Sequence, residues 1–237
     1  MTQKEQVMEA MRNNGGYATF QTLNSTVDFS TWGTKTPQAS IRGIVQSYKD
    51  FFRIQAGLWG LTEQKDAILK KLDIKDGDKK SMADFTHGYI QGIITEIGNK
   101  KNYSTYIPPQ DKNRMFLEKK LSDVATVHKI YNFTYPEILK FAKTVDCIWF
   151  NERNLPNSFY EVEHTTDIKN SLDKFYELQD YRAKFYIVAA NERKRQFESI
   201  LDKSIYNGIR DFVKFVSYDA LMQQYEKESI VVEGGEI

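Results

Sequence analysis

Hydrophobic and polar residues alternate with helical spacing in the first part of the chain. Thr2 and Glu5 have the spacing of a capping box, and apolar residues then follow on one face of a first helix. A short second helix is expected over 19–24. A third is expected over 37–48, where a Thr-Pro pair suits the cap and first turn and apolar residues recur at i, i+3, i+4 and i+7.

The pattern changes to a β-rich stretch over 51–61, which two glycines interrupt, as in a short hairpin. Three helices followed by a hairpin is the order of a winged helix-turn-helix, so we predict a DNA-binding domain over 1–62. The highly charged segment 63–82 contains an Asp-Gly-Asp turn and is interpreted as a short helix followed by an exposed linker.

The rest of the chain, 83–237, is predicted to be a second and larger domain. Its apolar runs alternate between helical and extended spacing, which predicts a mixed α/β sheet covered by helices on both sides. The expected strands are 103–107, 145–150, 158–164 and 185–190, and the expected helices cover 82–97, 136–143 and 168–178 and begin again near 192.

Three acids interrupt these predicted strands. Asp146 lies in an apolar run, and Glu161 and Glu163 are two residues apart, so they must point to the same side of one strand. Neighbouring carboxylates repel each other and are costly to remove from water, and a bound cation would relieve both costs. If the two strands pair as a hairpin, all three acids converge near one strand end. Spacing alone fits equally well with acids on a solvated edge and a capping Asp146.

Composition narrows the classes of protein without choosing a function. The 237 residues are 41% hydrophobic and 27% charged, which excludes wholesale disorder, and no apolar run approaches the roughly 20 residues of a membrane span. No secretory signal is visible, so we expect a cytoplasmic protein. The single cysteine, Cys147, excludes an internal disulfide framework, and the three scattered histidines have no metal-ligand spacing.

The net charge of +1 is unevenly distributed. Residues 1–131 carry +5 and residues 132–237 carry −4. A basic front with carboxylates behind it suits a protein that holds DNA near a metal site, and it suits ordinary solvated charge as well.

The run from Asp146 through Glu161-Val162-Glu163 to the apolar stretch 185–189 resembles the core of PD-(D/E)XK nucleases, which have the restriction-endonuclease fold. The front is similar to winged-helix modules fused to restriction enzymes. The two likenesses cover about residues 1–62 and 83–200. They imply an α/β fold with a mixed, restriction-endonuclease-like sheet and a small N-terminal winged-helix domain.

The resemblance implies a catalytic site of Asp146, Glu161 and Glu163, in which Asp146 and Glu161 bind Mg²⁺. The usual lysine of the motif is replaced by Glu163, as in a minority of similar type II restriction enzymes. Either Glu163 or a metal-bound water would then act as the base. An acid from the first helix often joins such sites; Glu96 is the matching residue, and a surface role for Glu96 is as consistent with the sequence.

The implied function is Mg²⁺-dependent hydrolysis of double-stranded DNA by a type II restriction or restriction-like defence enzyme, leaving 5′-phosphate and 3′-hydroxyl ends. A homodimer is expected because one site cuts one strand, and no small-molecule cofactor or membrane partner is expected. The third helix would enter the major groove. The DNA-binding residues expected on this reading are Lys35, Gln38, Ser40, Arg42, Gln46, Lys49 and Arg53.

Two other functions remain open. The chain could be a non-catalytic DNA-binding regulator, with a winged helix and a degenerate nuclease-like domain that serves only for dimerisation. It could also cut modified or invading DNA, with the winged helix sensing methylation. The sequence leaves the recognition sequence, the cleavage position and any dependence on methylation undetermined.

Overall fold

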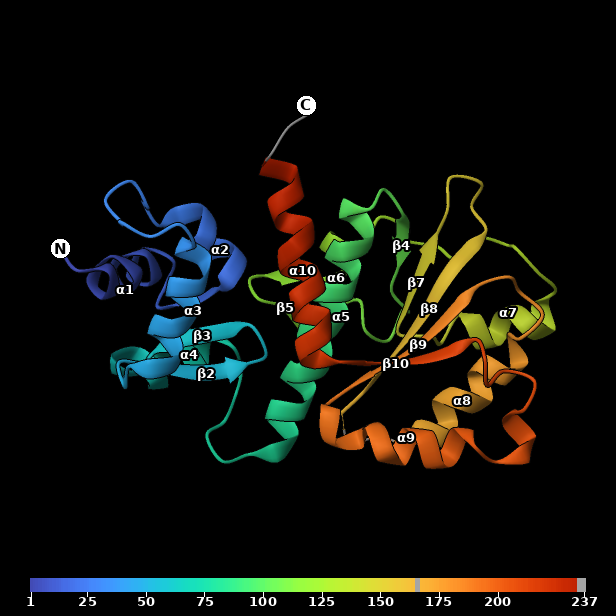
Figure 1. Ribbon diagram of the computed structural model, residues 1–237. Helices are drawn as coiled ribbons and strands as arrows, with labels where there is room; N and C mark the ends of the chain where they lie inside the picture. Colours follow the sequence, from blue (N-terminus) through green and yellow to red (C-terminus); the bar gives the residue numbers. More distant parts are fainter. Residues whose placement is uncertain (165–166, 234–237) are drawn as a thin grey trace. The chain divides into compact units, whose positions relative to one another are not determined.

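The computed structural model describes residues 1–164 and 167–233, and the chain divides into two compact units, Met1–Met82 and Ala83–Ile237 (Figure 1). The segment 63–82, interpreted from sequence as a short helix followed by an exposed linker, clusters with the first unit. The short helix is present and buries Ile68 and Leu69. This part of the segment is therefore packed and is not an exposed linker.

The first unit contains four α-helices, one short 3-10 helix and a small antiparallel sheet. The sheet has the strand order β1-β3-β2. In chain order its elements are α1 (Gln3–Asn13), β1 (Tyr17–Thr19), α2 (Phe20–Thr26), α3 (Pro37–Ser47), β2 (Phe51–Gln55), β3 (Leu58–Leu61), η1 (Thr62–Gln64) and α4 (Lys65–Lys71).

The local signals in this unit act as expected. The Thr2 side chain caps α1 and Glu5 reaches back to the Thr2 backbone, which completes the predicted capping box. Helix α3 buries Ile41, Ile44 and Val45 on one face. Strand β1 was not predicted, because three residues are too few to show an alternating pattern.

The second unit is built around a five-stranded mixed sheet of order β10-β9-β8-β7-β4. Strands β4, β7 and β8 pair antiparallel, whereas β8, β9 and β10 run parallel. The strands of this sheet are β4 (Ser104–Tyr106), β7 (Cys147–Phe150), β8 (Pro156–Glu163), β9 (Lys184–Ala189) and β10 (Val213–Ser217). The predicted hairpin of β7 and β8 is therefore present.

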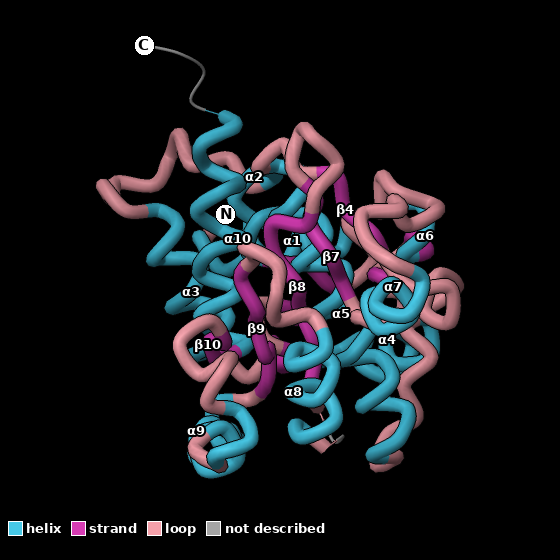
Figure 2. The backbone as a smooth tube through the Cα atoms, turned by 90° about the vertical axis from the view of Figure 1, so that its right-hand side faces the viewer, coloured by secondary structure: helices cyan, strands magenta, loops and turns pink. Residues whose placement is uncertain are grey.

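Helices cover both faces of this sheet, which confirms the predicted α/β class (Figures 1 and 2). Helices α5 and α10 lie on one face, and α8 and α9 lie on the other. The remaining elements are α5 (Lys79–Lys100), β5 (Met115–Phe116), β6 (Lys119–Lys120), α6 (Leu121–Val124), α7 (Pro136–Ala142), α8 (Ile168–Glu177), η2 (Asn191–Arg193), α9 (Lys194–Leu201), η3 (Ser204–Tyr206) and α10 (Tyr218–Glu233).

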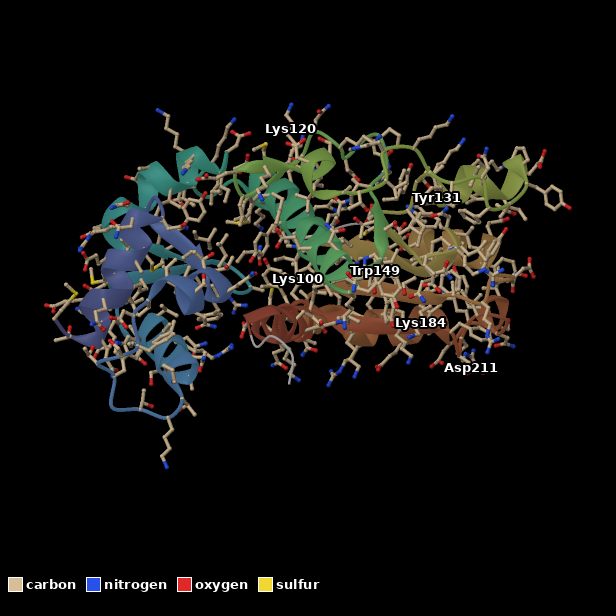
Figure 3. The ribbon with its side chains drawn as sticks, turned by 90° about the horizontal axis from the view of Figure 1, so that it is seen from above. Lys100, Lys120, Tyr131, Trp149, Lys184 and Asp211 are labelled. Atoms are coloured by element: carbon tan, nitrogen blue, oxygen red, sulfur yellow. The ribbon has the colours of Figure 1, made fainter. Side chains whose placement is uncertain are left out.

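Helix α5 approaches its neighbours closely because it carries glycines on its buried face. A Cβ atom at Gly98 would lie 2.6 Å from side-chain atoms of both Thr105 and Trp149, and one at Gly92 would lie 2.1 Å from the ring of Phe116. Figure 3 shows Trp149 on the sheet beside this helix. The glycines thus set the depth at which α5 lies against β4 and β7, and with it the position of the polar side chains nearer the helix start.

Strand β10 and helix α10 were not predicted from the sequence. Strand β10 pairs with β9 alone and is only half-buried over most of its length, so its hydrophobic pattern is weak. Within the described part of the chain, no helix combines the length and the apolar character that a membrane span requires.

Candidate active site

The end of β8 presents two buried carboxylates to helix α8. Glu161 and Glu163 are each 3% exposed, and both contact the Ser171 hydroxyl, which lies 2.9 Å from Glu161 Oε2. The predicted common orientation of the two acids is therefore confirmed. Between them, Val162 points to the opposite face of the strand, as alternation requires.

Asp146 lies directly before β7 and reaches across to β8. Its Oδ2 atom accepts a hydrogen bond of 2.7 Å from the backbone N–H of Val162, the residue between the two glutamates. The carboxylate is 8% exposed. A ladder N–H at the end of the hairpin thus fixes Asp146, so that all three predicted acids lie around one end of the β7–β8 pair.

The unfavourable effect of burying these acids together is seen in the pKa of Glu161. Burial raises the pKa of its carboxyl to about 8, and the nearby charge of Asp146 adds to the effect, against the opposing influence of Lys174 and Ser171. The Lys174 ammonium lies 2.9 Å from both oxygens of Glu161. Burial lowers the pKa of Lys174, but the attraction of Glu161 outweighs it and the net shift is upward.

The Ser171 hydroxyl shows how the charge is shared. A hydroxyl carries one proton, so Ser171 can donate to only one of its two carboxyl neighbours at a time. The other contact is a hydrogen bond only when that carboxyl is itself protonated and donates to the serine oxygen. This agrees with the raised pKa of Glu161 and describes two acids that share one hydroxyl rather than two independent carboxylates.

A second cation approaches Glu163 from the segment η2. Arg193 Nη1 donates a 2.9 Å hydrogen bond to the backbone carbonyl of Glu163 and lies 3.8 Å from its Oε2. The α8 side of the site, defined here as Glu161, Glu163, Ser171, Lys174 and Arg193, therefore balances two acids with two cations.

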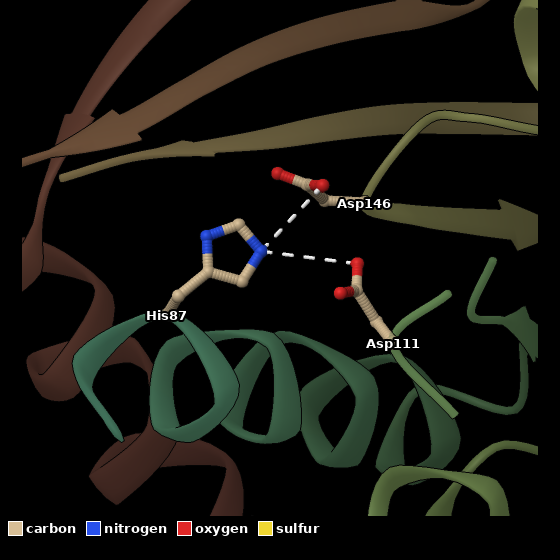
Figure 4. Close-up of side chains that lie close together, drawn as sticks. All are labelled: His87, Asp111 and Asp146. Atoms are coloured by element: carbon tan, nitrogen blue, oxygen red, sulfur yellow. Dashed lines mark ion pairs between the residues drawn. The ribbon is translucent and has the colours of Figure 1, made fainter. Parts of the chain in front are cut away.

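On its other side, Asp146 meets side chains from α5 and from the loop after β4 (Figure 4). His87 Nε2 lies 3.6 Å from Asp146 Oδ1 and 3.9 Å from Asp111 Oδ2. Gln91, one turn after His87, donates from Nε2 to Asp111 Oδ2 and to the Asp146 carbonyl, both at 3.0 Å. These side chains, with Asp111 and Asp146, form what we call the α5 side of the site.

The electrostatics of His87 follow from its two acidic neighbours. Burial lowers the pKa of the imidazole, but the hydrogen bond and charge of Asp146 and the charge of Asp111 outweigh burial, so that the net pKa is raised. Asp111 has a further partner, because Arg114 Nε donates to its Oδ1 at 2.6 Å.

Glu96 contacts helix α10. Its carboxylate accepts a hydrogen bond from the Tyr225 hydroxyl of α10, and the residue of α5 that approaches Asp146 is His87. The sequence reading also treated the histidines as scattered. His87 was not predicted as a site residue, because Asp111 and Asp146 lie in distant segments of the sequence. A glutamine, Gln91, on an apolar face of the predicted helix was a visible sign of a polar contact there.

Residues of α8 were missed for a different reason. Ile168, Leu172 and Phe175 form the apolar stripe of the helix, and Ser171 occupies a position in that stripe. A buried serine there was a visible signal of a polar partner across the interface. Lys174 follows three residues later, and its pairing with Glu161 depends on how α8 packs against β8, which the sequence pattern does not specify.

The seven residues expected to bind DNA are spread over α3 and its flanks in the first unit. Gln38, Gln46, Lys35, Lys49 and Arg53 are exposed, whereas Ser40 and Arg42 are partly buried. The Arg42 guanidinium lies 4.6 Å from the centre of the Phe20 ring, so this arginine also packs within its own unit.

The donor atoms around Asp146 suit a divalent cation. Asp146 and Glu161 supply hard carboxylate oxygens, the preferred ligands of Mg²⁺. Their burial, together with the raised pKa of Glu161, gives the unfavourable charge that such an ion would relieve.

Comparison with known proteins points to restriction enzymes. Residues 69–234 match the model of the type II restriction enzyme NmeDI C-terminal domain. The chain is 28% identical over 116 residues to the type II restriction enzyme NmeDI of Neisseria meningitidis serogroup C, which covers 45% of this chain and 33% of that enzyme. The alignment thus spans a third of the relative's length, and no solved structure gives a significant match. Since the matched family model covers most of the second unit and well over half of the sequence, the chain belongs to the NmeDI C-terminal domain family of type II restriction enzymes.

Proposed function

We propose that the protein is a Mg²⁺-dependent endonuclease that hydrolyses phosphodiesters of double-stranded DNA, as a type II restriction or restriction-like defence enzyme. The observation that carries the proposal is the group of three buried acids, Asp146, Glu161 and Glu163, at one end of the β7–β8 hairpin. Membership of a restriction-enzyme family supports the same reaction class.

The three acids would divide the work. Asp146 and Glu161 would hold Mg²⁺, which when bound neutralises charge that grows on a non-bridging phosphate oxygen. Glu163 would orient a water molecule and accept its proton. The water oxygen forms a bond to phosphorus while the bond from phosphorus to the 3′ oxygen breaks, and the leaving oxygen takes up a proton. The products carry 5′-phosphate and 3′-hydroxyl ends.

Lys174 places a cation beside the acids, at a different position in the sequence from the usual lysine of the PD-(D/E)XK motif. Position 163 is a glutamate where related nucleases carry lysine, yet the Lys174 ammonium lies 2.9 Å from Glu161. In the proposed reaction Lys174 is a positioning residue, which holds the Glu161 carboxylate in place and favours its ionised form against the effect of burial.

Plasmid cleavage tests the assignment. The parent protein and Glu161→Gln are incubated with supercoiled plasmid and Mg²⁺, together with Glu177→Gln, an exposed acid at the end of the same helix α8. We expect cleavage by the parent and by Glu177→Gln and a loss of at least about 10²-fold in Glu161→Gln, the scale for removing one group that stabilises developing charge. Equal cutting by all three proteins would refute the site.

The first unit is proposed to be a winged helix-turn-helix that places α3 in the major groove. Gln38, Arg42 and Gln46 would contact base edges with Ser40, while Lys35, Lys49 and Arg53 would contact phosphates. Gln38→Ala and Gln46→Ala test this more cleanly than Arg42→Ala, because Arg42 also stacks on Phe20. Each should relax sequence preference by about 1–3 kcal/mol per lost base contact; unchanged affinity and preference would exclude α3 as the recognition helix.

Two further parts of the proposal concern assembly and activity. A homodimer would allow both strands to be cut, and sedimentation with and without duplex DNA measures it. The competing function is a DNA-binding regulator with an inactive second unit. Its signature would be metal-independent binding to DNA without cleavage under any divalent ion.

A further inference from the structure

The α5 side of the site contains a set of metal-binding atoms in which two residues, His87 and Asp111, are not part of the proposed Mg²⁺ site. His87, Asp111 and Asp146 each offer one ligand atom, and these three atoms all lie within 4.8 Å of one another. Two ligands bonded at about 2.1 Å to one ion are separated by about 3–4 Å. The His87 distances of 3.6 and 3.9 Å to the two carboxylates already fall in that range.

Gln91 provides an independent sign that a ligand belongs here. Its side chain is fully buried, and its Nε2 holds Asp111 and the backbone of Asp146. Its Oε1 atom has no hydrogen-bond partner among the described residues. A buried amide oxygen without a partner is destabilising, and a cation or a cation-bound water beside Asp111 would satisfy it.

The ligand types indicate which ions fit. Two carboxylates suit any divalent cation, whereas an imidazole nitrogen favours first-row transition ions over Mg²⁺. Arg114 pairs with Asp111 Oδ1, whereas Oδ2 faces His87. Oδ2 also accepts the hydrogen bond from Gln91 Nε2, and its second lone pair is the one that would bind the ion. Supporting hydrogen bonds of this kind commonly orient metal ligands.

We infer that His87, Asp111 and Asp146 form a second divalent-cation site that takes a transition ion such as Mn²⁺ or Co²⁺ through the His87 imidazole. Asp146 belongs to both sites: Oδ1 faces His87, while its charge acts on Glu161 on the other side. The second site is separate from the proposed Mg²⁺ ligand Glu161, and binding of metal to it does not require that the protein cuts DNA.

Pulsed electron paramagnetic resonance with Mn²⁺ alone, in the absence of DNA, tests the inference. A histidine ligand adds a nitrogen modulation to the Mn²⁺ echo, which an all-oxygen site built on Asp146 and Glu161 does not give. We expect the modulation in the parent protein and in His128→Asn, an exposed histidine that serves as the matched control. It should be lost in His87→Asn, with Mn²⁺ affinity at this site lowered at least about tenfold.

Asp111→Asn provides the second variant, in case His87→Asn perturbs the helix. It keeps the imidazole and the size of the side chain but removes one ligand charge, and it should weaken the nitrogen-coordinated Mn²⁺ by a similar factor. An unchanged nitrogen modulation in folded His87→Asn would overturn the inference, as would a parent protein that binds Mn²⁺ through oxygen alone. In that second case plasmid cleavage by the parent would still stand, so the two proposals fail separately.

Discussion

Buried acids lie on both sides of Asp146, and different groups compensate their negative charge on each side. On the α8 side, Glu161 and Glu163 are compensated by permanent cations, Lys174 and Arg193, and by the Ser171 hydroxyl. On the α5 side, Asp111 has one permanent cation, Arg114, and the remaining charge faces an imidazole whose own charge varies.

The two sides therefore differ in how far their side chains are ordered before a metal ion binds. The α8 side holds its acids in place with groups that are themselves charged or hydrogen-bonded, so it is ordered before any ion arrives. The α5 side leaves a buried amide oxygen unsatisfied and relies on a titratable ligand. We expect the first to govern the reaction and the second to govern which additional ion the protein accepts.

The largest effect is expected when the proposed base on the α8 side, Glu163, is replaced. Glu163→Gln should lower plasmid cleavage by about 10²–10⁴-fold, the range for loss of a general base. The nitrogen signal of bound Mn²⁺ should stay unchanged, because Glu163 lies on the α8 side. Glu177→Gln again serves as the control, and undiminished cleavage by Glu163→Gln would leave metal-bound water as the base.

Lys174→Met should show how much the buried acids destabilise the folded protein when the ammonium is absent. Removal of the ammonium leaves Glu161 with the Ser171 hydroxyl as its remaining side-chain partner among the described contacts, so the free energy of unfolding should fall by about 1–3 kcal/mol. In Lys174→Met/Glu161→Gln the charge that needed a partner is gone, and most of the loss should be recovered. Urea unfolding measures both, and additive losses would show that the pair is uncoupled.

Gln91→Leu should act mainly on metal binding at the α5 side. Without the carboxamide, Asp111 loses the hydrogen bond that fixes Oδ2, and Mn²⁺ affinity should fall by about tenfold. Calorimetric titration with Mn²⁺ measures the change. Affinity equal to that of the parent would mean that Arg114 alone orients Asp111.

The smallest effect is expected from Ser171→Ala. The serine hydroxyl contributes to both glutamates, but Lys174 still pairs with Glu161, so the loss in unfolding free energy should be about 1 kcal/mol. Thermal unfolding at neutral pH measures it. A loss as large as that of Lys174→Met would show that the hydroxyl, rather than the ammonium, holds the acids together.

The sequence predicted the part of the site that local geometry determines. Alternation along one strand was enough to place Glu161 and Glu163 on the same side, and the hairpin brought Asp146 beside them. The same reasoning predicted the strands β7, β8 and β9 and the helices of the first unit.

What the sequence did not predict depends on packing between distant segments. His87 meets Asp111 and Asp146 only because α5 lies close against β4 and β7, which the absent side chain at Gly98 permits. For Glu96, on the same helix, a place in the site and a place on the surface both stayed open in the sequence, because the register of the helix against the sheet could not be deduced. One turn or two along α5 decides which polar residue reaches the strand ends.

Asp146 is the residue on which both sides depend, so Asp146→Asn tests the account most directly. The variant keeps the shape of the side chain but removes the charge shared by the two sides. With Mg²⁺ and plasmid, cleavage should fall at least about 10²-fold, and with Mn²⁺ alone the nitrogen modulation should disappear in the same protein. If Asp146→Asn folds, cuts plasmid as the parent does and keeps the modulation, Asp146 is not the shared ligand and the account is wrong.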